Sequence, residues 1–282
     1  MTEAAEHEVV EGRPFTVHLF GHTTVRTPAR TLRASDFSGV KPRQILELIA
    51  LGRGEQVRKA AIAEHIWSGR PPRRWQVTLE SYVALVRRAV QPGVPGRATV
   101  LCTTTGGYRL DVDRVRLDLL EFDDLTRRAA GTAPEHALPM WESALRVAGG
   151  TLLAAEPYAT WAVDARRSHE QVLHEAAVSG AETALALCLP ERAVPLARRA
   201  TEIDPLAEHG WQVLIRAQLA AGRRAEAAHA FHTCRDGLRR DLGVEPDART
   251  FELLAGVLAD QRVADLETAE PDRGDPRLAL PA

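Results

Sequence analysis

The spacing of apolar residues over the first 112 positions changes from strand-like to helix-like and back again. β-branched and alternating residues between turn-formers predict three short strands, at residues 15–21, 24–27 and 30–32. Apolar residues that recur three or four positions apart then predict three helices, at residues 42–51, 58–67 and 73–90. Two further apolar segments flank Gly106 and Gly107, which predicts a β-hairpin. We therefore expect a small α+β domain over residues 14–112.

From about residue 117 onward the pattern is helical throughout. Glycine and proline breakers separate predicted helices at residues 118–130, 134–148, 159–188, 190–203, 206–221, 223–240 and 247–260. The segments 137–150, 192–205 and 224–246 echo one another, each with small residues, a large apolar residue, a basic end and a breaker. This predicts tetratricopeptide-like all-α repeats over residues 117–260, which pack by stacking on their neighbours. The polar segments 1–13 and 261–282 are predicted to be flexible tails.

The charges are separated along the sequence, although the 282-residue chain has a net charge of only -2. Residues 13–110 hold 16 of the 36 Lys and Arg residues and five of the 38 Asp and Glu residues, a net charge of +11. Residues 113–282 hold 20 basic and 28 acidic residues, a net charge of -8. A basic domain joined to an acidic one is typical of a nucleic-acid binder with a separate regulatory part.

The third predicted helix, 73–90, has one apolar and one exposed face. At about 100° per residue, the buried face carries Trp75, Leu79, Val83, Val86 and Val90. The opposite face carries Arg74, Val77, Ser81, Ala84 and Arg88. Cations at both ends of an exposed face fit a major groove, where arginines meet phosphates or guanine edges and small side chains allow close approach.

Further candidate DNA contacts lie at the starts of the first two helices and around the hairpin. Helix-start amides and cations bind phosphate, and the hairpin is placed to reach the backbone or the minor groove. The full set of predicted DNA-binding residues is Lys41, Arg43, Arg58, Lys59, Arg73, Arg74, Val77, Thr78, Ser81, Ala84, Arg87, Arg88, Thr103, Thr104, Thr105, Tyr108 and Arg109.

Strands, three helices and a terminal hairpin are the layout of a response-regulator-type winged helix. The stretches KPRQILELIAL, AIAEHIWSGRPPRRWQVTLESYVALVRRAV, TTTGGYRL, LDLLEFDDL and RAEAAHAFHTCRDGLRRDLGVEP extend the likeness. They resemble the Streptomyces antibiotic regulatory protein family, which joins a winged-helix DNA-binding domain to a bacterial transcriptional activator domain. The resemblance covers about residues 14–258, and the joint occurrence of W-x-G-x-P-P with LRRDLGVEP is highly specific.

The resemblance implies a sequence-specific transcriptional activator of a secondary-metabolite (antibiotic) biosynthetic gene cluster. Its expected partners are double-stranded promoter DNA with direct repeats, a second copy bound head-to-tail, and RNA polymerase with its sigma factor and core subunits. The family's recognition helix maps onto residues 73–90 and its wing onto residues 102–110. The loop that faces polymerase maps onto Ser68, Gly69, Arg70, Pro71 and Pro72. No cofactor is implied.

Two other functions stay open at this point. A ligand-gated repressor would share the DNA-binding step, and a tetratricopeptide-type interaction scaffold would use its basic domain to bind an acidic protein or RNA. The acidic helical half either dimerises or braces the DNA-binding domain, or it offers a concave groove to a polymerase subunit, a peptide or a small ligand.

An enzyme is not expected. The sequence has no GxxxxGK[ST] and no G-x-S-x-G motif. His169 and His174 stand at i and i+5, whereas two zinc ligands on one helix face stand at i and i+4, so we expect a solvated helix face there and no metal site. His229 and His232 are expected to point away from Cys234, which shares an apolar stripe with Phe231.

Cysteines, tryptophans and hydropathy complete the expectations. Three widely spaced cysteines do not make a disulfide framework; Cys188 and Cys234 are expected to be buried, with Cys102 the more exposed thiol. Trp141, Trp161 and Trp211 are predicted core anchors. The sequence lacks both an apolar segment of bilayer length and an apolar signal core. We expect a cytoplasmic, nucleoid-associated protein with no membrane contact.

Overall fold

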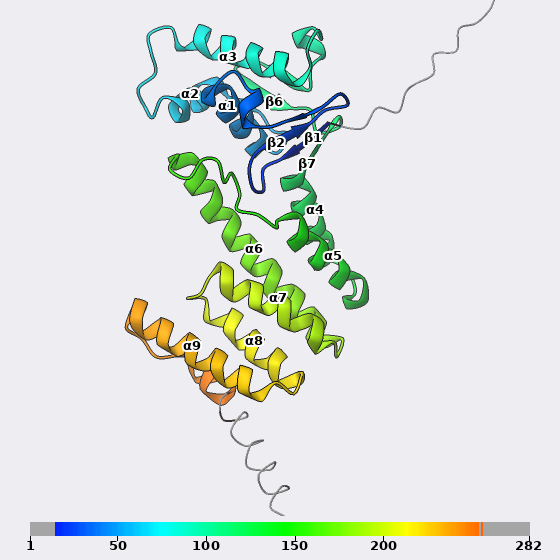
Figure 1. Cartoon of the computed structure of the whole chain (residues 1–282), viewed down its shortest axis with the longest axis vertical. Helices are drawn as coiled ribbons and strands as arrows, with labels where there is room; N and C mark the ends of the chain where they lie inside the picture. Colours follow the sequence, from blue (N-terminus) through cyan, green and yellow to red (C-terminus); the bar gives the residue numbers. More distant parts are fainter. Residues whose placement is uncertain (1–14, 254, 256–282) are drawn as a thin grey trace, which may run out of the picture. The chain divides into compact units, whose positions relative to one another are not determined.

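The computed structural model describes residues 15–253 and residue 255 (Figure 1). They divide into two compact units, one ending at Ala176 and the other beginning at Ala177. The predicted tails 1–13 and 261–282 lie outside the described residues, as does the end of the predicted helix 247–260, which is helical over residues 248–253. No described helix is both long enough and apolar enough to cross a membrane.

The first unit opens with a four-stranded sheet. β1 (Phe15–His18), β2 (Thr24–Arg26) and β3 (Thr31–Leu32) form where the sequence predicts strands. The sheet order is β3-β2-β1-β7, and β7 (Val115–Leu117) runs parallel to β1. β7 was not predicted, because three residues are too short for an alternation to stand out and its partner lies about 100 positions away in the chain.

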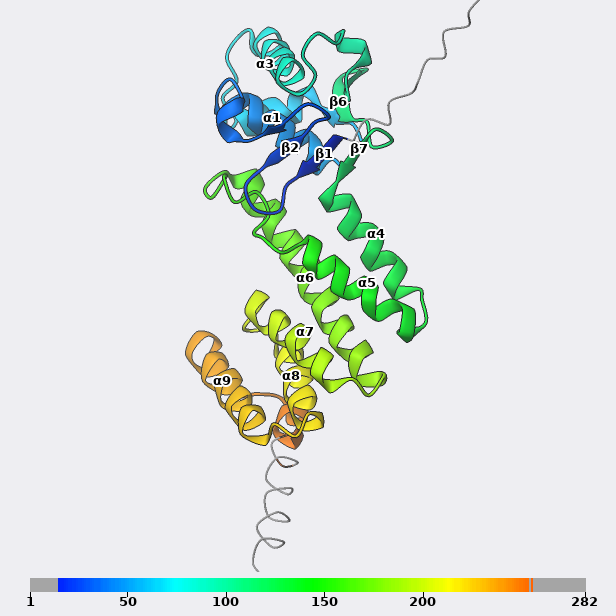
Figure 2. The same cartoon turned by 45° about the vertical axis from the view of Figure 1, so that its right-hand side comes forward.

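Three helices and a smaller sheet follow in the same unit (Figure 2). The helices are α1 (Val40–Leu51), α2 (Lys59–Ile66) and α3 (Trp75–Val90). The second sheet has the order β4-β6-β5, from β4 (Val57–Arg58), β5 (Leu101–Thr104) and β6 (Gly107–Leu110). A Cβ atom at Gly107 would lie 2.4 Å from the Val57 carbonyl oxygen, so only glycine allows β6 to approach β4 this closely.

One apolar core joins these elements to the segments that follow them. Ile45, Ile49, Leu79 and Leu110 are fully buried in it. The same core continues into Leu119, Leu152, Leu153 and Trp161, which belong to the region predicted as the separate helical domain. The first unit therefore contains both the winged helix and the start of the helical region.

That helical start consists of α4 (Asp118–Ala130), α5 (Pro134–Val147) and α6 (Thr160–Ala186), and the last helix crosses the boundary between the units. α4 packs on α5 as a hairpin. The prediction that Cys188 is buried was wrong: α6 ends at Ala186, and Cys188 is exposed with a φ of 57°. A helical stripe holds only while the helix continues.

The second unit stacks α7 (Pro190–Ile203), α8 (Glu208–Ala220) and α9 (Arg224–Leu242), each helix packing on the next. Alanines line the contacts, among them Ala197, Ala217 and Ala227, and their small side chains let the helices approach closely. Cys234 is buried, as predicted. The fold class is the predicted one, a small α+β N-terminal region followed by tetratricopeptide-like helices.

The three predicted tryptophan anchors differ in their surroundings. Trp141 and Trp161 are buried, which confirms the prediction for both. Trp211 is only half-buried, because one side of its ring borders a groove between helices.

Candidate nucleic-acid interface

The helix α3 divides its faces as the periodicity predicts. Leu79, Val83, Val86 and Val90 are buried against the winged-helix core. The outward face carries the exposed residues Arg74, Val77, Ser81, Ala84 and Arg88. Trp75, predicted on the buried side, is half-buried at the helix start.

The middle of this outward face is small and partly apolar. Val77 is 63% exposed, although a valine on a helix normally turns inward. The Ser81 hydroxyl donates to the Val77 carbonyl (2.9 Å), and the Thr78 hydroxyl donates to the Arg74 carbonyl (3.2 Å). Both hydroxyl oxygens keep lone pairs for an incoming donor. The surface can therefore make apolar contacts and accept hydrogen bonds.

The cations at its ends are free to bind an outside partner. The guanidinium groups of Arg73, Arg74 and Arg88 are exposed and form no hydrogen bond or ion pair within the described residues. Unpaired surface arginines keep their donors for phosphate oxygens or guanine edges. Arg58, at the start of α2, is exposed as well.

Arg87 has a different role from the predicted DNA contact. Its Nε and Nη2 donate to the Leu101 carbonyl at 3.0 and 2.7 Å, and Nη2 also donates to the Thr103 hydroxyl at 2.8 Å. Its side chain therefore connects α3 with β5, the first strand of the wing. Arg87 orients the wing relative to the helix, and its Nε and Nη2 donors are already occupied.

A second polar connection joins α3 to the wing near the helix start. The Lys59 ammonium pairs with Glu80 at 2.6 Å and lies 5.5 Å from the Tyr108 ring centre. The hydrogen bond to the Glu80 carboxylate raises the pKa of Lys59. Tyr108 is only 2% exposed, and burial raises the pKa of its hydroxyl, so its prediction as a surface contact was wrong. Lys59 is largely engaged within the domain.

The wing tip presents threonines to solvent. Thr103 and Thr105 are exposed at the β5–β6 turn, and the Thr105 carbonyl accepts a hydrogen bond from Gln56 at 3.0 Å. Thr104 is half-buried, and its hydroxyl has no partner among the described residues. Arg109 is half-buried on β6.

Arg43 is not placed for the phosphate contact predicted from its position near a helix start. It is 8% exposed, pairs with Glu156 and lies 3.4 Å from Glu47 one turn along α1. Gln44 donates to the other Glu156 oxygen at 2.7 Å. The segment before α6 covers this end of α1, so the Arg43 charge is neutralised inside the unit. Nearby, Lys41 is half-buried with its ammonium 5.3 Å from the Trp67 ring.

The segment that supplies Glu156 is itself held in place. Arg166 of α6 donates to the carbonyls of Leu152, Leu153, Glu156 and Pro157 at 3.0–3.2 Å. Backbone hydrogen bonds also join Leu153 to Leu19 and Gly21 to Thr151, both at 2.8 Å. The position of Glu156 opposite Arg43 is thus fixed by the fold.

Within this network Glu47 has an unusual acidity. The Thr23 hydroxyl donates to its carboxyl at 2.6 Å, and the other oxygen has no described partner. Burial raises the pKa of Glu47 to about 7, because the loss of solvation outweighs the Thr23 hydrogen bond and the Arg43 charge.

Two further residues of this junction differ from expectation: Asp118 was not predicted to have a role, and His169 was predicted on a solvated helix face. The Asp118 carboxylate, at the start of α4, accepts the backbone N–H groups of Leu19 and Phe20 at 2.8 and 3.0 Å, and burial raises its pKa. His169 is not on a solvated face: it is 6% exposed between the rings of Phe20 and Phe122, and burial lowers its pKa to about 4.

A sequence signal for the burial of His169 exists. Leu173, Ala176 and Ala177 follow it at i+4, i+7 and i+8, and all three are buried.

His229 and His232 are exposed and point away from buried Cys234, as expected. No three His, Cys, Asp or Glu side chains of the described residues come together as metal ligands.

The loop predicted to face polymerase, Ser68–Pro72, is exposed along its length. Ser68 and Gly69 have φ values of 48° and 78°, so the chain turns sharply after α2. Trp67 stacks on Tyr82 of α3, with ring centres 6.5 Å apart, and fixes the start of the loop.

Comparisons with known proteins agree on the kind of molecule. Residues 117–258 match the family described as the bacterial transcriptional activator domain. The chain is 30% identical over 230 residues to the regulatory protein DnrI of Streptomyces peucetius, which covers 77% of this chain and 84% of the relative. It is 26% identical over 235 residues to the transcriptional regulatory protein MoaR1 of Mycobacterium tuberculosis, covering 80% of this chain and 74% of the relative.

A solved structure shares the fold. Mycobacterium tuberculosis EmbR, in complex with a low-affinity phosphopeptide, matches with a TM-score of 0.72 at 21% identity, covering 93% of this chain and 73% of that chain. Together with the matches above, the chain belongs to the Streptomyces antibiotic regulatory protein family, whose members are transcriptional regulators that carry a bacterial transcriptional activator domain.

Proposed function

We propose that this regulator binds duplex DNA in a sequence-specific manner, with α3 in the major groove and the β5–β6 wing on the adjacent backbone or minor groove. The observation that carries the proposal is the outward face of α3, where unpaired arginines flank small and apolar side chains. Arginines supply phosphate and guanine contacts, and Val77 and Ala84 suit thymine methyl groups.

The output we propose is activation of a secondary-metabolite biosynthetic gene cluster. Two copies would occupy direct repeats head-to-tail, and the exposed loop Ser68–Pro72 would contact RNA polymerase. DnrI is a regulatory protein of an organism of the genus that gives the family its name, which supports the biosynthetic assignment. Members of the family are regulators and not enzymes, so no catalytic step is proposed.

The DNA step is tested by first selecting bound sequences from a random duplex pool with the full chain. Gel shifts on the selected duplex then compare variants of the outward face of α3, which we call the reading face. Arg74→Ala and Arg88→Ala should each weaken binding by more than about 1 kcal/mol, because each removes a phosphate or base contact. Arg167→Ala, which removes an exposed arginine of α6, is the matched control and should leave affinity unchanged. Unchanged affinity in both reading-face variants would contradict the proposal.

The wing is tested through the salt dependence of the same equilibrium. Arg109→Ala should reduce the slope of log K against log[salt] by about one unit, as expected for the loss of one phosphate contact. An identical slope would place the wing off the DNA. Tighter binding to single-stranded RNA than to random duplex at both of two salt concentrations would favour the scaffold instead.

Activation is tested in a transcription assay with purified polymerase. Arg70→Ala, in the exposed loop, should reduce transcript yield while DNA affinity stays unchanged. Full activation by this variant would remove the loop from the polymerase contact, and reduced transcription on adding the wild-type protein would identify a repressor.

A further inference from the structure

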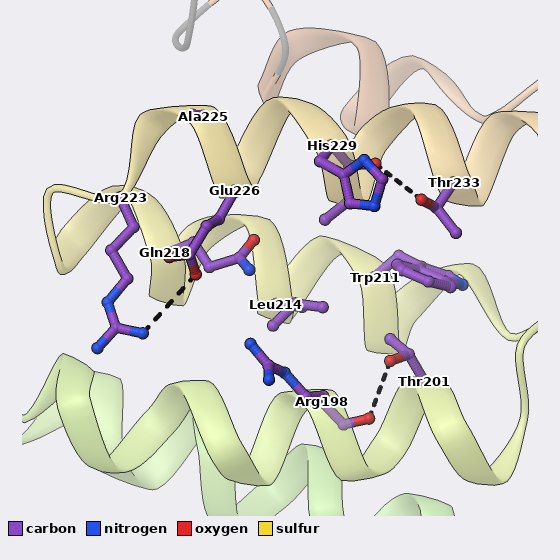
Figure 3. Close-up of a pocket in the computed structure, with 11 residues that line it drawn as sticks. Arg198, Thr201, Trp211, Leu214, Gln218, Arg223, Ala225, Glu226, His229 and Thr233 are labelled. Carbon is purple, nitrogen blue, oxygen red and sulfur yellow. Dashed lines mark hydrogen bonds and ion pairs between the residues drawn. The ribbon is translucent and has the colours of Figure 1, made fainter.

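The second unit contains a groove of about 570 Å³ bordered by α7, α8 and α9 (Figure 3). Trp211, Leu214, Ala225 and Ala230 supply its apolar lining, and the other seven lining side chains are polar or charged. Small-molecule sites are concave, largely apolar and about 300–1,000 Å³ in volume. The groove therefore has the size of a site for a small ligand, and its lining combines an apolar floor with several polar groups.

One polar group in the groove lacks a partner. Gln218 is 4% exposed, and its carbonyl oxygen forms no hydrogen bond within the described residues. Figure 3 shows its amide among the lining side chains, between Glu226 and Leu214. A buried polar atom without a hydrogen bond costs about 1–3 kcal/mol. Rotation of the amide presents either its acceptor or its donor to a ligand.

One cation in the groove, Arg198, has no ion-pair partner among the described residues. No carboxylate of the described residues pairs with the Arg198 guanidinium, which points from α7 toward Leu214 in Figure 3. The other arginine of the groove, Arg223, pairs with Glu191 and lies 3.7 Å from Glu226. The groove therefore has one neutralised arginine, Arg223, and one that attracts an anion, Arg198.

The aromatic wall favours a planar ligand. The indole N–H of Trp211 donates to the Pro205 carbonyl at 2.8 Å, which fixes the ring and leaves its face as the contact surface. The hydroxyls of Thr201 and Thr233 donate to the Arg198 and His229 carbonyls. The groups left for recognition include the Trp211 ring, the Gln218 amide, the Arg198 guanidinium and the His229 imidazole.

We propose that this groove binds a low-molecular-weight aromatic carboxylic acid that carries an N–H or O–H donor. The carboxylate pairs with Arg198, the donor bonds to Gln218, and the ring lies on Trp211. An acidic protein segment offers the same groups, but residues 113–282 carry a net charge of -8 and repel a highly charged partner more than a single anion. This site goes beyond the proposed DNA binding, which makes no use of it.

The test is isothermal titration of the full chain with indole-3-carboxylate, which combines a planar ring, an N–H and a carboxylate. Saturable binding of one molecule per chain is expected. Arg198→Met and Gln218→Leu should each weaken it by about tenfold, the loss expected for one hydrogen bond to a charged or buried group. Arg216→Met, on the same helix as Gln218 but outside the groove, should bind as the wild type does.

Two further measurements make the result decisive. Indole-3-carboxamide, which lacks the charge, should bind about tenfold more weakly than the acid and should not respond to Arg198→Met. Gln218→Leu should unfold at the same or higher urea concentration as the wild type, because it replaces an unpaired buried amide, so any loss of binding is not a loss of fold.

Three outcomes would overturn the proposal. They are no saturable binding of the acid at millimolar concentration, equal affinity in the Arg198→Met variant, and tighter binding of a phenylalanine-containing acidic tetrapeptide than of the acid. The last would assign the groove to a protein partner. None of these outcomes alters the gel-shift results, so failure here is distinguishable from failure of the DNA-binding proposal.

Discussion

Arg43 and Arg88 both lie on helices of the basic N-terminal region, yet they have opposite surroundings. Arg88 is exposed on α3 with its donors free, whereas Arg43 is buried against Glu156 and Glu47. An exposed arginine that neutralises a phosphate displaces counterions condensed on the DNA. A buried arginine that is already paired with a carboxylate cannot neutralise a phosphate. The net charge of the region therefore overstates the number of cations that can contact DNA.

The two surroundings also serve different parts of the molecule. The outward face of α3 is exposed and contributes little to folding, and it is the surface that we propose for DNA. The Arg43 network, with Asp118 and β7, joins the winged helix to α4 and to the segment before α6. The winged-helix region and the beginning of the activator region thus share one folded unit.

The largest expected effect comes from cutting the chain between these parts. A fragment that ends at residue 112 loses β7, Asp118 and Glu156, so Leu19, Phe20 and Arg43 lose their partners. We expect it to give no cooperative thermal unfolding transition by circular dichroism. A fragment that ends at residue 176 should unfold cooperatively, and equal cooperativity in both would show that the junction is dispensable.

The next effect concerns the buried pair itself. Arg43→Met leaves the Glu156 carboxylate buried without its cation and should lower the free energy of unfolding by about 3–5 kcal/mol. Urea denaturation measures this loss. The matched exposed change, Arg73→Met, should stay within about 0.5 kcal/mol of the wild type. Similar losses of unfolding free energy in the two variants would contradict the distinction between a buried, paired arginine and an exposed one.

The pH dependence of stability tests the burial of Glu47, the carboxyl that lies beside Arg43. Glu47 has a pKa of about 7 in the folded chain, against an ordinary value of 4.5. The stability that its protonated carboxyl contributes to the fold is therefore complete below pH 4.5 and is lost as the pH rises through 7. Relative to the wild type, Glu47→Gln should therefore gain roughly 2–3 kcal/mol of stability between pH 4.5 and pH 7. Urea titrations at several pH values measure the difference.

His169 provides the control of opposite sign. Its folded pKa of about 4 lies below its ordinary 6.5, so its contribution is complete above pH 6.5 and is lost as the pH falls through 4. His169→Phe should consequently lose stability relative to the wild type as the pH rises over that range. Differences that stay flat with pH in both variants would contradict the burial of these groups.

The smallest effect tests Arg87 as a positioning residue. Arg87→Ala removes the hydrogen bonds to Leu101 and Thr103 and should weaken binding to the selected duplex by about 1 kcal/mol, the value of a typical hydrogen bond. Binding to random duplex should change little, whereas Arg88→Ala should weaken both. Equal losses on both duplexes in Arg87→Ala would instead make it a direct phosphate contact.

Much of the fold follows from local sequence patterns. The bounds of α4 equal the predicted 118–130, and the outward face of α3 is the predicted one. Both depend on apolar residues spaced along a single helix. The candidate site was predicted only in part. Arg74 and Arg88 are exposed as expected, whereas Arg43 and Arg87 bond to other residues of the same unit and Tyr108 is buried.

The sequence by itself determined the order of elements, the outward face of α3 and the separation of charge between the two halves, because each depends only on composition or on residues close together in the chain. Only the tertiary structure decided that Glu156 neutralises Arg43, that β7 completes the sheet beside β1, and that His169 lies between two phenylalanines. Those contacts join residues 47 to 149 positions apart. Local periodicity gives the face on which a side chain lies, and the folded chain decides which distant segment covers that face.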